Sequence, residues 1–179
     1  MLDRARSLLL VVDVQERLLP AMADPAAVVE GCGKLMRGAA RLSVPILVTE
    51  QYPSGLGPTV PALKSLAPDQ AVVAKVHFSG AADPGIAAWL QASGRSQAVL
   101  CGLESHVCVQ QTALQLKAQG WEVFVAGDAI SSRRRQSMEL AVARMRERGC
   151  EIVDVEMVLF EWLGKAGTSE FKDLSRIIK

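Results

Sequence analysis

The amino-acid sequence predicts an α/β fold in which one open parallel sheet of six strands carries helices on both faces. Short apolar runs alternate with helical periodicity from one end of the chain to the other, which is typical of βα units. Some runs are apolar without interruption, as at residues 8–12, and such runs indicate central strands buried on both faces. The chain has 179 residues, half of them hydrophobic, which is enough for one sizeable core and short of two. We therefore expect residues 1–179 to form a single domain.

Six apolar runs supply the predicted strands. They lie at residues 8–14, 44–49, 71–75, 98–102, 122–126 and 150–155. Between them, two helices have recognisable starts, because Asp24 precedes Pro25 and Asp83 precedes Pro84. An aspartate at the N-cap followed by a proline at the first helical position is a common way to begin a helix.

The remaining helices are predicted from periodicity. One begins near His106 and stops at Gly120, and another ends at Gly149. Residues 157–163 and 171–178 favour short helices that cover a sheet edge or contact another subunit. Residues 51–68 contain too many prolines and glycines for a long regular element. We expect a structured loop there that forms one wall of a pocket, because ligands bind beyond the carboxyl ends of parallel strands.

Charge and composition exclude several classes of function. The formal net charge is +1, and the only tight basic run, residues 133–135, is interpreted as the solvated start of a helix. We therefore expect no nucleic-acid partner. No stretch approaches the roughly 18 apolar residues of a membrane span, so no membrane association is expected either. The four cysteines form no CxxC pair, which favours reduced thiols and a cytoplasmic location.

Three reactive side chains occupy equivalent positions at the ends of predicted strands. Asp13 ends the first apolar run, Lys75 ends the third, and Cys108 follows the fourth by a few residues. Parallel strands point the same way, so these side chains converge on the crevice where the strand order reverses. A carboxylate at the end of an apolar run is costly unless a cation such as Lys75 pairs with it.

Together these three residues form a plausible catalytic centre for nucleophilic attack. Cys108 lies in the first turn of a predicted helix, where the helix dipole and a neighbouring lysine favour a thiolate. A nearby carboxylate can take the thiol proton and return it to a leaving amine. Taken singly, each residue has an ordinary explanation as a helix cap, a surface charge or a small core residue.

Four ordered segments resemble the isochorismatase-like hydrolases. They are LVVDVQ at residues 10–15, VAK at 73–75, GLESHVCV at 102–109 and AGDAISSR at 126–133. The third is similar to the nucleophile segment of that family. Four segments in order are far more specific than any one of them. EQYP at 50–53 and GLGPT at 55–59 resemble the subgroup of isochorismatase-domain-containing proteins.

The resemblance implies a Rossmann-like three-layer sandwich and assigns roles to the three residues. Asp13 would be the general base, Lys75 its electrostatic partner and Cys108 the nucleophile that forms an acyl-enzyme. It also implies a cis peptide between Leu103 and Glu104, which would aim the backbone N–H groups of Glu104 and Cys108 at one oxyanion. A homo-oligomer, a dimer or larger, is implied as well, with contacts from residues after Val155.

The sequence departs from the nicotinamidases of that family. Those enzymes hold a divalent metal with histidines between the second and third strands, whereas residues 49–75 contain no histidine. We therefore predict no metal site and no nicotinamide substrate. No cofactor is predicted, because GCG at 31–33 and GLG at 55–57 lack the strand, turn and helix context of a dinucleotide site. Substrate-pocket candidates are Gln15, Leu18, Gln51, Tyr52, Phe78, Glu104 and His106.

The predicted function is therefore metal-independent hydrolysis of a C–N bond in a small amide or ureide. One alternative is hydrolysis of a vinyl ether related to isochorismate, which family members perform without a cysteine nucleophile. A second is a noncatalytic oligomeric or interaction protein that keeps the fold. A redox sensor ranks last, because it needs a resolving thiol and Cys101 is expected inside a strand.

Overall fold

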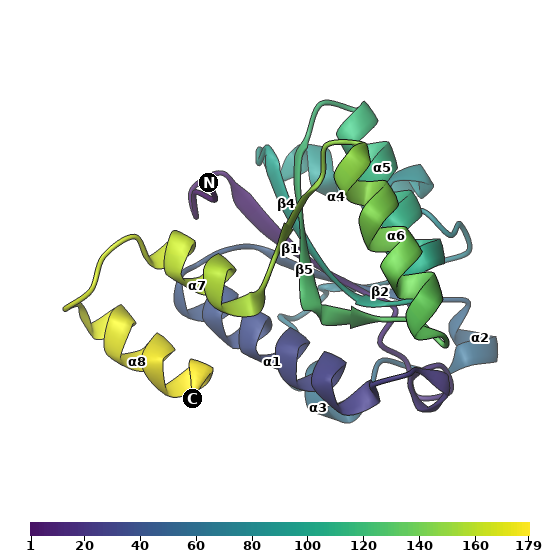
Figure 1. Ribbon diagram of the computed structural model, residues 1–179, viewed down its shortest axis with the longest axis horizontal. Coiled ribbons are helices and arrows are strands. Elements are labelled where there is room, and N and C mark those ends of the chain that lie inside the picture. The colour runs from purple at the N-terminus through teal and green to yellow at the C-terminus, as the bar shows by residue number, and fades with distance from the viewer.

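The computed structural model describes residues 1–179 and contains one six-stranded parallel sheet with the order β3-β2-β1-β4-β5-β6 (Figure 1). The strands are β1 (Ser7–Val12), β2 (Ile46–Gln51), β3 (Val72–Lys75), β4 (Gln97–Leu103), β5 (Glu122–Ser131) and β6 (Glu151–Val153). The six predicted strands and the α/β class are confirmed. The chain passes from β1 to β2 and β3 on one side and to β4, β5 and β6 on the other, so the order reverses between β1 and β4.

The predicted strand ends differ from the observed ones by one or more residues in most strands, and two of these differences have a clear structural cause. β1 ends at Val12 because Asp13 turns into the left-handed region with φ of 55°. β5 continues to Ser131, beyond the predicted end at residue 126, because its register against β4 shifts and pairing resumes at Ile130 and Ser131. Hydrophobic pattern alone misses this extension, because a bulge interrupts the apolar run.

Helices cover both faces of the sheet, as predicted. One face carries α1 (Pro25–Arg41), α7 (Val155–Leu163) and α8 (Ser169–Ile178), and the other carries α4 (Pro84–Ala92), α5 (Gln110–Ala118) and α6 (Arg135–Glu147) (Figure 1). Both predicted caps are present, since Asp24 accepts from the Ala27 N–H and Asp83 from the Gly85 N–H. Helices α7 and α8 pack on α1, so they thicken one face of the molecule.

The helix predicted from His106 to Gly120 is divided in two. Its first five residues form a wider π-helical turn, η3 (Ser105–Val109), and α5 follows. Such turns inside α-helices are frequent at functional sites. Residues 51–68 contain two single-turn helices, α2 (Pro53–Leu56) and α3 (Pro61–Lys64), each beginning at a proline, and no long element. Two further 3-10 turns are η1 (Leu19–Ala21) and η2 (Gly80–Ala82).

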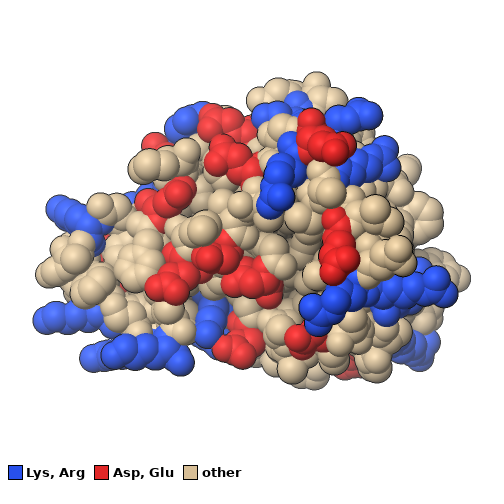
Figure 2. Space-filling model, in the orientation of Figure 1, with Lys and Arg blue, Asp and Glu red and all other residues tan.

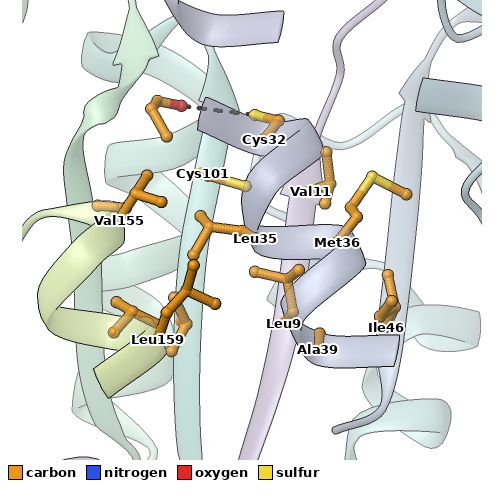
Figure 3. Close-up of a cluster of buried hydrophobic side chains, with 14 of the residues drawn as sticks. Leu9, Val11, Cys32, Leu35, Met36, Ala39, Ile46, Cys101, Val155 and Leu159 are labelled. Carbon is orange, nitrogen blue, oxygen red and sulfur yellow. Dashed lines mark hydrogen bonds between the residues drawn. The ribbon is translucent and has the colours of Figure 1, made fainter. Parts of the chain in front are cut away.

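Two hydrophobic clusters fill the space between the sheet and its helices. Leu9 and Val11 of β1 point into the cluster beneath α1, and Leu8 and Leu10 point into the opposite one. The buried side chains under α1 include Cys32, whose thiol approaches the Ala129 carbonyl at 3.6 Å (Figure 3). Cys32 therefore serves as a packing residue of this core. None of the helices combines the length and the apolar composition needed to cross a bilayer.

Candidate active site

The carboxyl ends of β1, β3 and β4 bring the three predicted catalytic side chains together. Asp13 follows β1 directly, Lys75 is the last residue of β3, and Cys108 lies in η3, five residues beyond the end of β4. β1 and β4 flank the reversal of strand order, where ligands bind in open α/β sheets. The three side chains therefore lie at the carboxyl edge of the sheet, where the strand pattern predicts the site.

Asp13 and Lys75 form a buried ion pair. Lys75 Nζ donates to Asp13 Oδ2 at 2.8 Å, and both side chains are completely inaccessible to solvent. Thr49 Oγ1 donates to the other carboxylate oxygen, Asp13 Oδ1, at 2.6 Å. A carboxylate buried this deeply needs such partners, because an unpaired charge in the interior is strongly unfavourable.

The Lys75 ammonium is surrounded by protein acceptors. Besides Asp13 it donates to Gln51 Oε1 at 2.7 Å and approaches the His77 and Phe78 carbonyls at 3.2 and 3.4 Å. Its three N–H donors thus have four acceptors within the chain. Lys75 acts on its surroundings through Asp13, and no N–H remains for a ligand.

Cys108 is a neutral thiol, contrary to the expected thiolate. Burial, and to a smaller extent the negative charge of Asp13, raise the pKa of Cys108 to about 12, against a smaller lowering by Lys75. The residue is only 4% exposed, so loss of hydration outweighs the lysine and any effect of the short η3 turn. Asp13 raises the pKa of this thiol both through its charge and as a hydrogen-bond acceptor, which makes Asp13 the candidate to take the proton when Cys108 attacks.

The raised pKa of Cys108 predicts a specific dependence of stability on pH. The folded state keeps the thiol proton up to a pKa of about 12, whereas the unfolded thiol loses it near about 9. This contribution is complete below pH about 9 and is lost as the pH rises toward 12. Between about pH 8 and about pH 10, wild type should lose about 1 kcal/mol more unfolding free energy than Cys108→Ala. Urea unfolding across this range tests it, and parallel curves for the two proteins contradict it.

The expected cis peptide between Leu103 and Glu104 is not present. The chain contains no cis peptide bond, and Glu104 instead adopts a left-handed conformation with φ of 55° and ψ of 61°. This turn achieves the change of direction after β4 in another way. No group in the chain accepts a hydrogen bond from the Glu104 N–H, so this donor is unused. A non-glycine residue held in this region indicates local strain, which is common at functional sites.

The Glu104 side chain is fixed by residues that follow β5. Arg133 donates to both carboxylate oxygens of Glu104, with Nε–Oε1 of 3.1 Å and Nη2–Oε2 of 3.2 Å. His106 Nε2 lies 3.6 Å from the same carboxylate, and His106 Nδ1 lies 2.9 Å from Ser132 Oγ. A hollow of about 380 Å³ beside them is lined by His106, Arg133, Arg134 and Ser137. His106 lines this hollow, which Asp13, Lys75 and Cys108 do not line, and its role in a substrate pocket stays a prediction.

Two of the predicted pocket residues, Gln15 and Gln51, use their side-chain amides for hydrogen bonds within the chain. Gln15 is fully buried, and its amide binds the backbone of Gln51 and Gly57. The Gln51 side chain binds Lys75 and the Val76 carbonyl. With their amide atoms paired inside the chain, Gln15 and Gln51 hold the 51–57 segment against the site, and the expectation that they line a pocket is corrected.

The other pocket candidates lie nearer the surface. Tyr52 and Phe78 are 58% and 55% exposed, and each follows a strand that supplies the site. Leu18 is partly buried against the core under α1. Sequence reasoning missed Thr49 as a partner of Asp13 and Arg133 as a partner of Glu104. Their positions near the carboxyl ends of β2 and β5 are the signal that could have found them. No group of three or more His, Cys, Asp or Glu side chains is arranged to hold a metal ion.

Comparison with known proteins identifies close relatives over most of the chain. It is 39% identical over 178 residues to a secreted isochorismatase effector, Isc1, of Phytophthora sojae, covering 97% of this chain and 84% of that protein. It is 38% identical over 176 residues to isochorismatase domain-containing protein 2A of Mus musculus, covering 97% and 82%.

Solved structures match equally well. A structure described as the MAR1 ribonuclease of Caenorhabditis elegans superposes with a TM-score of 0.93 at 32% identity, covering 99% of this chain and 91% of that one. YcaC of Escherichia coli, described as an octameric hydrolase of unknown specificity, gives 0.92 at 25% identity, covering 98% and 89%. The model of the isochorismatase domain matches residues 7–157. The chain therefore belongs to the isochorismatase family.

Proposed function

We propose that residues 1–179 act as one metal-independent hydrolase domain, which cleaves a C–N bond of a small amide or ureide through an acyl-enzyme on Cys108. The observation that carries the proposal is the fully buried Asp13–Lys75 pair beside a thiol that is neutral at rest. A neutral cysteine needs a base at the moment of attack, and Asp13 is placed to serve as that base. Hydrolase-named members of the same fold agree with this class of chemistry.

The first half of the reaction forms the acyl-enzyme. Asp13 takes the thiol proton as Cys108 Sγ bonds to the carbonyl carbon, and the π electron pair moves to the carbonyl oxygen. The unused N–H of Glu104, with that of Cys108, stabilises this oxyanion. As the C–N bond breaks, protonated Asp13 gives its proton to the leaving nitrogen.

The second half releases the acid. Asp13 takes a proton from water as the water oxygen attacks the thioester carbonyl. The C–S bond then breaks, and Asp13 returns the proton to the Cys108 sulfur. Lys75 contacts no substrate in this scheme. It holds the Asp13 carboxylate in its buried position and balances its charge while the proton moves.

Replacing Cys108 with serine tests the nucleophile. Over a panel of small amides and ureides, ammonia release by wild type should fall at least about a thousandfold in Cys108→Ser, because the hydroxyl is a far weaker nucleophile here. Cys150→Ala is the matched control, since Cys150 is another buried free cysteine, before β6, and this variant should keep wild-type activity. Equal turnover by Cys108→Ser and wild type contradicts the proposal.

The same panel separates the alternatives. Isochorismate tests vinyl ether hydrolysis, and activity on it that survives in Cys108→Ser favours that route. The name of the C. elegans relative makes RNA a further panel member. Acidic and basic side chains are interspersed on the face shown in Figure 2, which does not favour a polyanion. A native Cys108 that reacts with no electrophile favours the noncatalytic alternative.

Assembly and location complete the proposal. Because an E. coli relative is described as octameric, we expect this chain to form a homo-oligomer, which sedimentation would show. Its partners are a small-molecule substrate and further copies of itself. The four cysteines are all free and buried, which supports a reducing compartment, the cytoplasm, although a Phytophthora relative is named as secreted.

A further inference from the structure

We infer that Thr49 is a positioning residue, which holds the Asp13 carboxylate in the one orientation that can take the Cys108 proton. The inference rests on the proposed function of Asp13 as the base. Thr49 bears no reactive group and lies outside the four family-like segments. The observation that supports its role is the 2.6 Å hydrogen bond from Thr49 Oγ1 to Asp13 Oδ1.

Thr49 holds Asp13 at two points. It lies in β2 opposite Val12 of β1, and its carbonyl accepts the Asp13 N–H at 3.1 Å. Its hydroxyl donates to the Asp13 side chain. The left-handed turn at Asp13, with φ of 55°, occurs at the residue where both contacts are made. One threonine thus fixes both the backbone and the carboxylate of the base.

The two oxygens of Asp13 have different partners, which defines the orientation of the group. Oδ2 binds the Lys75 ammonium at 2.8 Å and Oδ1 binds the Thr49 hydroxyl. With only the lysine, the carboxylate can still rotate about its last torsion, which is soft in aspartate. The second donor removes that freedom, and the carboxylate keeps free lone pairs for the thiol.

Thr49 is itself rigid. It is 1% exposed within β2, and a β-branched side chain has few rotamers in a strand. The hydroxyl has a single proton, which is used on Asp13. An alternative is that the pair merely satisfies a buried hydroxyl, with no consequence for the base. The two readings predict opposite orders for two conservative variants.

The variants Thr49→Val and Thr49→Ser distinguish a role of the hydroxyl in positioning Asp13 from a role of the Thr49 side chain in packing. Valine keeps the shape and the buried methyl groups but removes the hydroxyl, whereas serine keeps the hydroxyl and leaves a small cavity. A positioning role predicts that Val impairs the base and Ser does not. A packing role predicts that Ser is the more damaging variant. Circular dichroism and thermal unfolding establish that both variants are folded.

The rate at which acrylamide adds to Cys108 reports how well Asp13 removes the thiol proton, and this measurement requires no known substrate. In this reaction the Sγ–C bond forms, the C=C π bond breaks, and the thiol proton passes through Asp13 to the α-carbon of acrylamide. Mass spectrometry of the peptide that contains Cys108 gives the rate at neutral pH. Cys108→Ala verifies the site of labelling, and a small free thiol gives the unassisted rate.

The expected rates follow from the role of the base. Wild type should react faster than a free thiol, although the pKa of Cys108 is raised to about 12. Thr49→Val should react at least about tenfold more slowly and Thr49→Ser within about threefold of wild type, since a positioned base contributes about a hundredfold or more. Thr59→Val is the matched control, because it removes another buried hydroxyl-to-carboxylate bond, which goes to Glu50 and not to Asp13. It should react like wild type.

Each other result has a definite meaning. If Thr49→Val reacts like wild type, or Thr49→Ser is as slow as Thr49→Val, the hydroxyl does not position the base and the inference is wrong. If wild-type Cys108 reacts no faster than the free thiol, the proposed base itself is wrong, and the inference falls with the proposed function. Slow labelling of Asp13→Asn together with normal labelling of Thr49→Val would mean that Asp13 is the base but that Thr49 does not position it.

Discussion

Gly102→Ala is expected to be the most destabilising single-methyl change in the chain, with a loss of at least about 4 kcal/mol of unfolding free energy. Gly102 has φ of 122°, which L side chains rarely adopt. A Cβ there would lie 2.1 Å from the Val12 carbonyl oxygen and 2.7 Å from the Val12 nitrogen. These are backbone atoms of the neighbouring central strand, so neither strand can yield without breaking the sheet beside the site.

Urea unfolding of a matched glycine variant isolates the steric part. Gly120→Ala also occurs at positive φ, 91°, but a Cβ there meets nothing within 4 Å. Gly120→Ala should cost only the conformational penalty, about 1 kcal/mol. Similar losses for the two variants would mean that β1 and β4 can separate, and would contradict the predicted close approach.

Lys75→Met is expected to lower the unfolding free energy by about 3–5 kcal/mol and to abolish any activity that depends on Cys108. Methionine fills the space of the lysine stem but leaves the Asp13 carboxylate, which is wholly inaccessible, without its cation. Gln51 and the carbonyls of His77 and Phe78 lose their donor at the same time. The cost comes from the buried polar groups that remain, more than from the contact itself.

A double-mutant comparison tests this explanation. Lys64→Met, on exposed α3, is the matched control and should change stability by less than about 0.5 kcal/mol. Adding Asp13→Asn to Lys75→Met removes the unpaired charge, so the double variant should be more stable than Lys75→Met alone. If the double variant is less stable, the buried charge is not the cause of the loss.

The sequence predicts the position of the site better than its ionisation. The convergence of Asp13, Lys75 and Cys108 follows from apolar runs, because parallel strands must end at the same edge. The charge state of Cys108 does not follow. It depends on the balance between burial and two opposite neighbouring charges, and only coordinates give that balance.

Hydrogen-bond partners were equally difficult to predict. Gln15 and Gln51 are polar residues after strands, a pattern that favours a pocket, yet both amides are used inside the chain. A sequence pattern predicts where a side chain lies in the fold but not which groups form hydrogen bonds with it. At Gly102 the sequence does carry a signal, because a glycine inside an apolar strand favours a close backbone approach.

The central place of β1 has a consequence for the newly made chain. Its neighbours β2 and β4 come from distant parts of the sequence, and parallel pairs of this kind form slowly because long loops must close first. Until they form, Cys108 is an ordinary, hydrated thiol with a lower pKa than in the native state. Before folding, oxidants of any size can reach this sulfur, whereas in the native state it is only 4% exposed. Rapid completion of the sheet therefore shields the nucleophile from large oxidants.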